Sequence, residues 1–457
     1  MNGASRLGDV ALGDRLAGAH GTLVVSASGI LSALVRDDTG VARTAAAGDG
    51  FAAEIADAVR AGDASSMIAS SGRVVVVRSA GAAESHSGEP VQSSVAGSVH
   101  SGAGARERAI AVDMTNWSVA VESDNADLVD VVKVVGIWGG ADRAARQLTR
   151  IEKRGAGIIP PFIGRLEWEH PERGTSTIAL VSSLIAGAED GWAWAVDDVL
   201  AFAGGGPEPE WPARVGTLAA EMHGALLAFA DAAAPRLAGA ALRARAEAAL
   251  EEALRVTDGP AGVRLHKRVK ALRAMIAGIP DHSPACVFDL HGDFHVGQVL
   301  RSPAASGDPT EYDYWVIDFD GDPQLDDVDR DRPDFSARDV AHVLTSIDLV
   351  GAVAMRRLGA ALPLVRDWAA RARVQLLTAY REALAATSVG DSLDERLLEG
   401  FIVEQLLREL IYAHRYLPRW QYAPDAVITF SYPLTPGLDA GMLTEEEPWT
   451  PPVFTTT

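Results

Sequence analysis

Apolar residues in the first part of the chain fall into short runs separated by turn residues, a pattern that predicts β-strands. These runs are rich in Val, Ile and Leu, and they lie at residues 22–25, 30–35, 74–77, 110–112, 118–121, 128–135 and 178–181. One helical stretch, residues 51–60, follows Gly48-Asp49-Gly50, which is typical of a turn that opens a helix. The first part of the chain is therefore predicted to be β-rich.

Later apolar residues recur with the period of an α-helix. Residues 213–230 and 265–276 both place Leu, Ile, Val or Met at three- and four-residue intervals. The cations interleaved with the second run indicate a solvated helix face rather than an anion site, and they are Arg264, Lys267, Arg268 and Lys270. Residues 81–106 are rich in Gly, Ser and His and predict a linker. An α+β chain with a mainly helical second part is expected.

The residues with the clearest chemistry form two motifs. The first is His291-Gly292-Asp293-Phe294-His295-Val296-Gly297-Gln298, and the second is Ile317-Asp318-Phe319-Asp320-Gly321. An aspartate followed five positions later by an amide side chain, and then by a second aspartate after an apolar run, matches the order of the protein-kinase active site. This order predicts a phosphotransferase.

Each residue type in these motifs suits that chemistry. Asp293 could accept the proton of an acceptor hydroxyl, as a general base does. Gln298 and Asp318 offer the oxygen ligands that Mg²⁺ prefers, and Asp320 is the other carboxylate close enough to contribute. A turn before the strand-like residues 314–317 would bring Asp318 back beside Gln298.

Two alternatives from other classes remain open. His291, Asp293 and His295 stand at alternate positions and could bind zinc or a di-metal centre for phosphate hydrolysis. The downstream Asp-Phe-Asp-Gly and the position of Gln298, five residues after Asp293, favour a kinase over a metal-dependent hydrolase. A catalytically inactive, sugar-binding regulator with a kinase fold is the second alternative, and the intact Lys133, Asp293, Gln298 and Asp318 argue against it.

The paired motifs, including the Asp-Pro at positions 322–323, closely resemble the maltokinase-like branch of the aminoglycoside phosphotransferase superfamily. Residues 404–420 resemble the glucosamine kinases more than the maltokinases. This resemblance implies a bilobal α+β fold of the eukaryotic-protein-kinase type. It further implies an N-terminal cap at 1–85, a β-rich N-lobe at 86–185, a helical C-lobe with the catalytic and acceptor sites at 186–440, and a C-terminal tail at 441–457.

The nucleotide site is expected around Lys133, which lies inside the apolar run Val-Val-Lys-Val-Val. A lysine buried there needs an anionic partner, whereas a lysine on an edge strand could point to solvent. The resemblance implies that Lys133 contacts the ATP phosphates, that Asn116 and Ser118 cover them, and that Ser183 and Ile185 lie at the hinge beside adenine. No Gly-x-Gly-x-x-Gly precedes Lys133, and its acidic partner could be Asp142 or Glu152.

The acceptor site is expected on a helix at residues 401–416. Helical spacing aligns Gln405, Glu409, Tyr412 and Tyr416, a polar and aromatic stripe that suits a sugar. Glu409 could pair with the ammonium of an amino sugar. The structural alternative is that Glu404, Arg408 and Glu409 form ion pairs on the protein surface while the two tyrosines pack in the core. The resemblance to the glucosamine kinases adds further candidates to this site, namely Arg408, His414 and Trp420.

Composition narrows the partners. The net charge of −21 argues against nucleic acid and favours a cationic substrate. Residues 23–35, the longest apolar stretch, are interrupted by serines and too short to span a membrane, and the N-terminus lacks a signal-peptide pattern. The single cysteine, Cys286, fits a reducing cytoplasm and suggests a buried packing role. A monomer or weak homodimer is expected.

Together these observations predict ATP- and Mg²⁺-dependent phosphorylation of glucosamine, with Asp293 both as the base and in contact with the sugar. The resemblance implies the 6-hydroxyl as the acceptor group. Maltose and an aminoglycoside are the alternative acceptors within the same class.

Overall fold

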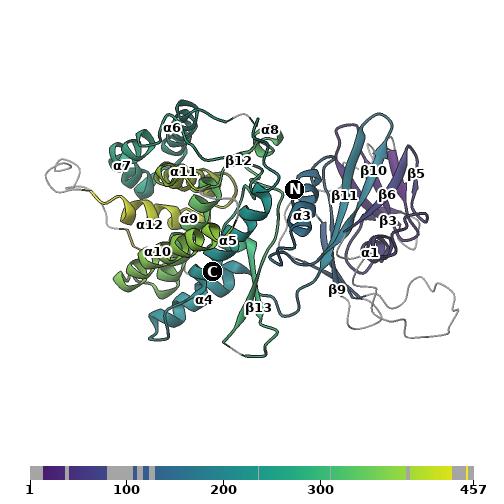
Figure 1. The fold of residues 1–457 in the computed structure, drawn as a ribbon, viewed down its shortest axis with the longest axis horizontal. Coiled ribbons are helices and arrows are strands. Elements are labelled where there is room, and N and C mark those ends of the chain that lie inside the picture. Colours follow the sequence, from purple (N-terminus) through teal and green to yellow (C-terminus); the bar gives the residue numbers. More distant parts are fainter. Residues whose placement is uncertain are drawn as a thin grey trace. The chain divides into compact units, whose positions relative to one another are not determined.

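The computed structural model describes residues 14–36, 41–79, 106–110, 117–122, 129–234, 236–308, 310–387, 392–434 and 449–450. The chain divides into two compact units, Met1–Ala186 and Gly187–Thr457. The first is built mainly from strands and the second mainly from helices (Figure 1). The predicted α+β class is confirmed, whereas the finer division of the first unit into a cap and an N-lobe stays a prediction.

The first unit contains two antiparallel sheets. One has the strand order β4-β3-β2-β1-β5. Its strands are β1 (Asp14–Ala17), β2 (Thr22–Val25), β3 (Leu31–Arg36), β4 (Ala42–Thr44) and β5 (Ile68–Ala69). The predicted strands at 22–25 and 30–35 are confirmed as β2 and β3.

The second sheet of this unit has the strand order β6-β10-β11-β9-β8-β7. Its strands are β6 (Arg73–Arg78), β7 (Arg106–Ala109), β8 (Trp117–Glu122), β9 (Val129–Val134), β10 (Phe162–His170) and β11 (Gly174–Ser183). β6 belongs to the segment expected to form the cap, yet it pairs with β10. Residues 111–112 of the predicted strand at 110–112 lie outside the described residues.

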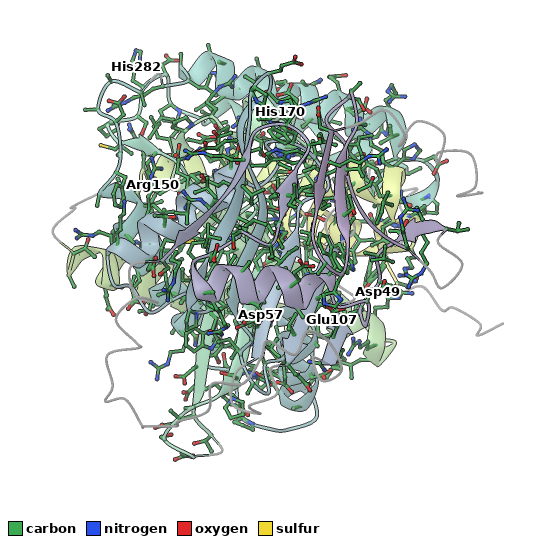
Figure 2. The ribbon with its side chains drawn as sticks, turned by 90° about the vertical axis from the view of Figure 1, so that its right-hand side faces the viewer. Asp49, Asp57, Glu107, Arg150, His170 and His282 are labelled. Atoms are coloured by element: carbon green, nitrogen blue, oxygen red, sulfur yellow. The ribbon has the colours of Figure 1, made fainter. Side chains whose placement is uncertain are left out.

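Helix α1 (Phe51–Ala61) is fixed to the second sheet at both of its ends. The Glu107 carboxylate on β7 accepts hydrogen bonds from the N–H groups of Gly48, Gly50 and Ala53 at 2.7, 3.1 and 3.0 Å. Figure 2 shows Glu107 near the end of α1 at which the helix begins. Because the first N–H groups of a helix have no partner inside the helix, this carboxylate supplies the missing cap. At the other end Arg60 pairs with Asp130 on β9, the strand that carries Lys133.

The second unit is a helical assembly with two small antiparallel sheets of two strands each. The longer helices are α4 (Gly191–Ala203), α5 (Trp211–Leu227), α6 (Gly239–Val256), α7 (Gly259–Ala277), α9 (Ala337–Leu358), α10 (Pro363–Ala385), α11 (Leu398–Tyr416) and α12 (Tyr422–Ser431). One sheet pairs β12 (Val287–Phe288) with β15 (Asp334–Phe335), and the other is a hairpin of β13 (Val299–Pro303) and β14 (Tyr312–Val316). α9 packs against α4, α10, α11 and α12 and is buried along most of its length. Among the helices described, none has both the length and the apolar character needed to cross a bilayer.

The expected solvated face on α7 is wrong for two of its cations. Arg264 and Arg268 are buried. Arg264 forms a two-pronged pair with Asp425 of α12 at 2.9 and 2.5 Å. Arg268 donates to the carbonyl oxygens of Arg264 and Thr429. These bonds replace the water that a guanidinium loses on burial, and they attach α7 to α12.

The buried role expected for Cys286 is also wrong, because its side chain is exposed. Val287 and Phe288 are buried. The apolar run therefore begins one residue after the cysteine, where β12 begins.

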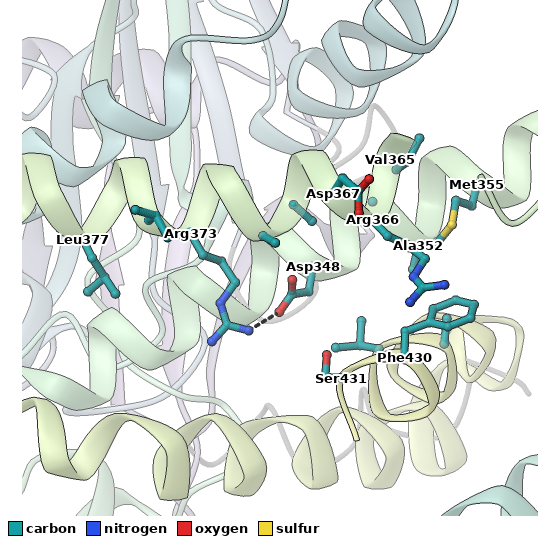
Figure 3. Close-up of a pocket in the computed structure, with 16 residues that line it drawn as sticks. Asp348, Ala352, Met355, Val365, Arg366, Asp367, Arg373, Leu377, Phe430 and Ser431 are labelled. Atoms are coloured by element: carbon teal, nitrogen blue, oxygen red, sulfur yellow. Dashed lines mark hydrogen bonds and ion pairs between the residues drawn. The ribbon is translucent and has the colours of Figure 1, made fainter. Parts of the chain in front are cut away.

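Helices α9, α10 and α12 surround a pocket of about 480 Å³, shown in Figure 3. An ion pair lies in its wall, with Arg373 Nη1 donating to Asp348 Oδ2 at 3.0 Å. Burial raises the pKa of the Asp348 carboxyl to about 6, an effect that Arg373 partly offsets. The folded protein thus holds a proton on this group at a pH where the unfolded chain has released it.

This proton makes the stability contribution of Asp348 depend on pH. Below about pH 4 the Asp348 carboxyl is protonated in both the folded and the unfolded state. Above about pH 6 it is ionised in both, and only the folded state is destabilised, because only there is the charge buried. The stability of the wild type relative to Asp348→Asn is expected to fall by up to about 3 kcal/mol as pH rises through this window, at about 1.4 kcal/mol per tenfold change in proton affinity. Urea unfolding at the two ends of the window measures it. Asp367→Asn, at an exposed acid of the same pocket, should show no such change, and a constant gap for Asp348→Asn would refute the expectation.

Candidate functional site

The turn at residues 291–293, predicted to be catalytic and called the catalytic turn below, is held by a carboxylate of α9. Asp339 Oδ2 accepts the His291 N–H, and Asp339 Oδ1 accepts the Gly292 N–H, both at 2.9 Å. His223 Nε2 lies 3.1 Å from Asp339 Oδ2 and completes the set of partners of this buried acid. Gly292 has φ 86°, a left-handed conformation that favours glycine. Asp339 therefore supports the backbone of this turn.

His291 supports the same turn through both of its ring nitrogens. Nε2 lies 2.9 Å from the Ile317 carbonyl oxygen, and Nδ1 accepts the Asp293 N–H at 3.3 Å. A histidine engaged in this way has no lone pair left for a metal ion. Among the described residues no group of three or more His, Cys, Asp or Glu side chains is arranged to hold a metal. The arrangement therefore gives no support to the hydrolase alternative.

Asp293 presents its two carboxylate oxygens to two histidines. Oδ1 lies 3.6 Å from Nδ1 of His342, and Oδ2 lies 3.9 Å from Nε2 of His295. The carboxylate keeps 18% of its surface exposed, so one side remains accessible to another molecule. His295 in turn accepts the Gly297 N–H at its Nδ1, which leaves its Nε2 to face Asp293.

The electrostatics of this position favour a base. Burial raises the pKa of the Asp293 carboxyl well above its usual range. The neighbouring carboxylates of Asp322, Asp318 and Glu409 add to this effect, and Arg408 opposes it. A carboxylate with a raised pKa accepts a proton more readily than an ordinary aspartate, as a general base must.

The β13–β14 hairpin brings the two predicted metal ligands together. Gln298 precedes β13, Asp318 follows β14, and Gln298 Nε2 lies 3.4 Å from Asp318 Oδ2. The Ile317 N–H donates to the Gln298 carbonyl at 3.0 Å and extends the hairpin pairing up to this point. Asp318 has φ 63°, which is rare for a residue with a side chain. Asp320 lies in the same turn, so the predicted donor set is a hard-oxygen set that fits Mg²⁺.

A residue that the sequence reasoning missed, Asp322, links this turn to α11. Its carboxylate is buried and forms an ion pair with Arg408 of α11 at 2.5 Å. Asp322 Oδ1 also accepts the Gln324 N–H at 2.8 Å. Arg408, which was predicted to contact substrate, therefore has a carboxylate partner within the protein. The sequence offered one signal for Asp322, its position directly after Gly321, but seven other acids nearby obscured it.

The polar stripe predicted on α11 is present and is connected by hydrogen bonds. Gln405 Nε2 donates to Glu409 Oε1 at 3.1 Å, and Trp420 Nε1 donates to Glu409 Oε2 at 3.0 Å. The rings of Tyr412 and Tyr416 lie 5.2 Å apart, one turn further along the helix. Glu409 therefore holds a fixed orientation beside an indole ring, as expected of a site for a polar ligand with an apolar face.

His414 is not brought into this group by the hydrogen bonds and ring contacts recorded for the described residues. It is exposed in the last turn of α11. Trp192, which sequence reasoning missed, is brought in instead. Its ring lies 5.5 Å from Trp420 and 5.8 Å from His295. The Asp190 side chain caps α4 by accepting the Trp192 N–H and so positions this residue.

The predicted nucleotide residues lie in the first unit. Lys133 of β9 is half-buried and stands opposite Ser118 of β8 and Leu180 of β11, so it does not lie on an edge strand. The Ser183 N–H donates to the Pro161 carbonyl at 2.9 Å, and Ile185 follows β11 as a half-buried residue. Asn116 lies outside the described residues.

The acidic partner of Lys133 was left open between two residues of α3 (Asp142–Lys153). The Asp142 side chain accepts the Thr177 N–H at 2.7 Å and so holds the start of α3 against β11. This hydrogen bond engages one oxygen of Asp142, and the acidic partner of Lys133 stays a prediction.

Comparison with known proteins gives consistent relatives. A glucosamine kinase of Streptacidiphilus jiangxiensis is 35% identical over 328 residues, which cover 71% of this chain and 73% of that protein. A glucosamine kinase of Mycolicibacterium smegmatis is 32% identical over 331 residues, 70% of this chain and 78% of that protein. A solved glucosamine kinase in complex with glucosamine, ADP and inorganic phosphate has a TM-score of 0.69 and 30% identity, covering 92% of this chain and 94% of its own. No protein-family model matches the chain.

Proposed function

Since the chain belongs to the glucosamine kinase family, we propose that it transfers the γ-phosphoryl group of ATP to a hydroxyl of glucosamine, the 6-hydroxyl by preference. The resemblance inferred from the motifs alone is confirmed by these relatives. The observation that carries the substrate proposal is the half-buried Glu409 carboxylate, oriented by Gln405 and Trp420 in the same cluster as Asp293.

The chemistry requires one proton transfer and one displacement at phosphorus. The acceptor oxygen forms a bond to the γ-phosphorus while the bond from this phosphorus to the β,γ-bridging oxygen breaks, and ADP leaves with that electron pair. Asp293 takes the proton of the hydroxyl. Its raised pKa suits this task, because the pKa of a general base should lie near the pH at which the enzyme works.

Magnesium fits the donor set at the β13–β14 hairpin. Gln298 and Asp318 would hold it, with Asp320 from the same turn. When bound, the ion offsets the negative charge of the phosphates. The ion pair of Asp322 with Arg408 neutralises a further acid and anchors the following turn to α11.

For the nucleotide we propose Lys133 as the phosphate contact, together with Ser118 and Asn116, and Ser183 and Ile185 near the base. Lys133 is half-buried within a sheet, where an ammonium group needs an anionic partner. The proposal for these residues rests on the sequence resemblance and on this placement.

Glu409 is proposed to pair with the ammonium group of the amino sugar. Burial raises the pKa of its carboxyl, while hydrogen bonds from Trp420 and Gln405 oppose the rise. An acid in this position is stabilised by a cationic ligand. Tyr412 and Trp420 offer ring faces for the C–H face of the sugar. The roles of Arg408, which pairs with Asp322, and of the exposed His414 rest on the sequence resemblance alone.

An assay that couples ADP release to NADH oxidation, run with glucosamine, glucose, maltose and kanamycin, tests the proposal. Turnover with glucosamine well above that with the other three supports it. Turnover with maltose or kanamycin alone overturns it.

Glu409→Gln is expected to raise the KM for glucosamine about 10- to 100-fold, because a charge-assisted bond worth about 1.5–3 kcal/mol is lost. The KM for glucose, which lacks the ammonium group, should change little. Initial-rate kinetics on both sugars measure the difference. Glu399→Gln, at an exposed acid in the first turn of α11, is the matched control. An equal rise in KM for both sugars would show that Glu409 does not read the amino group.

A further inference from the structure

One face of α9 contacts the catalytic loop at three points. Asp339, His342 and Ser346 follow one another at three- and four-residue intervals and therefore lie on the same side of the helix. Asp339 accepts two N–H groups of the catalytic turn, and Ser346 Oγ accepts the Val296 N–H at 3.1 Å. Asp339 and Ser346 bind backbone, whereas His342 faces the side chain of Asp293. Nothing in the proposed reaction has yet given His342 a task.

The hydrogen bonds around His342 determine which nitrogen carries its proton. Gln405 Nε2 lies 3.1 Å from Glu409 Oε1, and because a carboxylate can only accept, this contact fixes the orientation of the amide. The same nitrogen lies 3.0 Å from His342 Nε2, which must therefore be the acceptor. The proton is then on Nδ1, the nitrogen 3.6 Å from Asp293 Oδ1.

The surroundings keep this ring neutral. His342 is buried, and burial lowers the pKa of its imidazole well below the usual range. The nearby His295 and Arg408 act in the same direction. A neutral ring has one N–H and one lone pair, which is the form that the two contacts require.

We propose that His342 is a positioning residue that connects acceptor recognition at Gln405 to the orientation of the Asp293 carboxylate. The inference deepens the proposed function and rests on it. The connection runs from Glu409 through the amide nitrogen of Gln405 and the imidazole of His342 to Asp293 Oδ1, and it leaves Oδ2 to receive the proton of the hydroxyl.

The connection has a kinetic consequence. Gln405 uses its nitrogen for Glu409 and His342, so its carbonyl oxygen is the atom left for a sugar hydroxyl. An acceptor that binds Gln405 and Glu409 stabilises the orientation of every side chain in this connection. An acceptor that does not contact them leaves Asp293 less well aligned. A better acceptor should therefore have a higher kcat as well as a lower KM, since orientation acts on the chemical step.

Three variants test the inference with glucosamine and glucose as acceptors. His342→Ala should lower kcat for glucosamine about 30- to 100-fold, with the KM for ATP within about twofold, and should reduce the glucosamine-to-glucose ratio of kcat. His342→Asn keeps an N–H near the position of Nδ1 and should recover at least about tenfold of the loss. In a double-mutant cycle, His342→Ala and Gln405→Ala should be non-additive in kcat, because both interrupt one connection.

Controls separate this role from simple support of the fold. Thr345→Val changes a buried polar side chain of α9 whose hydroxyl donates to the Ala341 carbonyl of the same helix, and it should leave kcat unchanged. If His342→Ala does not fold, the same double-mutant cycle in kcat is measured with His342→Asn, Gln405→Ala and their double mutant. Additive effects, or an equal loss of kcat for both sugars, overturn the role of His342 while glucosamine turnover by the wild type stands. Absence of glucosamine turnover in the wild type overturns the proposed function, and this inference with it.

Discussion

Asp293→Asn is expected to lower kcat for glucosamine by about 10³- to 10⁴-fold, the upper part of the range for general-base catalysis. The amide has nearly the shape of the carboxylate but cannot take up the proton of the hydroxyl at neutral pH. The substituted side chain keeps an oxygen for His342 or His295, so the local packing should persist. Initial rates over a range of sugar concentrations give the loss.

Binding and folding measurements show whether the loss arises in the chemical step. Calorimetric titration with ADP should give a Kd within about twofold of wild type, because no proton transfer is involved in binding. Asp327→Asn removes an acid whose side chain is 92% exposed and which follows the predicted metal ligands Asp318 and Asp320 in the sequence. It should leave kcat unchanged. If Asp293→Asn retained more than about a tenth of the wild-type kcat, Asp293 would not be the base.

Asp339→Ala is expected to lower the free energy of unfolding by about 3–5 kcal/mol, the range for a lost buried network. The substitution leaves two backbone N–H groups of the catalytic turn without their acceptor and removes one of the two partners of the buried His223, the other being Tyr380. Activity should fall as well, because these bonds set the position of the turn that precedes Asp293. Urea unfolding followed by circular dichroism measures the change in stability.

Asp339→Asn should have a smaller effect than Asp339→Ala. An amide can accept from one of the two N–H groups but presents a donor to the other, so about one bond is lost instead of two. Asp367→Ala, at an exposed acid of α10, is the control and should change stability by less than about 0.5 kcal/mol. Equal stabilities for Asp339→Ala and the control would contradict the role assigned to Asp339.

The regular elements followed from the sequence where local pattern determines them. Residues 22–25 are a short apolar run next to turn residues and form β2, and the period of residues 401–416 matches α11. The hairpin that joins Gln298 to Asp318 could be predicted as well, because a strand-like run on each side of a Gly- and Pro-containing loop is a local signal.

Long-range pairing could not be predicted in this way. β6 joins β10 although some ninety residues separate them in the chain, and no local pattern selects one sheet over the other. Charged residues posed the same difficulty. Whether an arginine faces water or is buried depends on its partner, and Asp425, the partner of Arg264, lies 161 positions away.

The site was predicted in its chemistry but not in its connections. Asp293, Gln298 and Glu409 were found because each carries a functional group at a spacing that the chemistry explains. Asp322 and His342 were missed because their importance comes from contacts with other helices, the first with Arg408 and the second with Gln405. Such contacts leave no periodic trace in the sequence.

The single, exposed Cys286 has a practical use. Because the chain contains no other thiol, a maleimide fluorophore would attach at this position alone, without any substitution. The labelled residue directly precedes β12, and β12 pairs with β15, the strand that leads into α9 and Asp339. A probe there would report on the environment of the strands that lead into the catalytic turn while sugars are titrated into the native sequence.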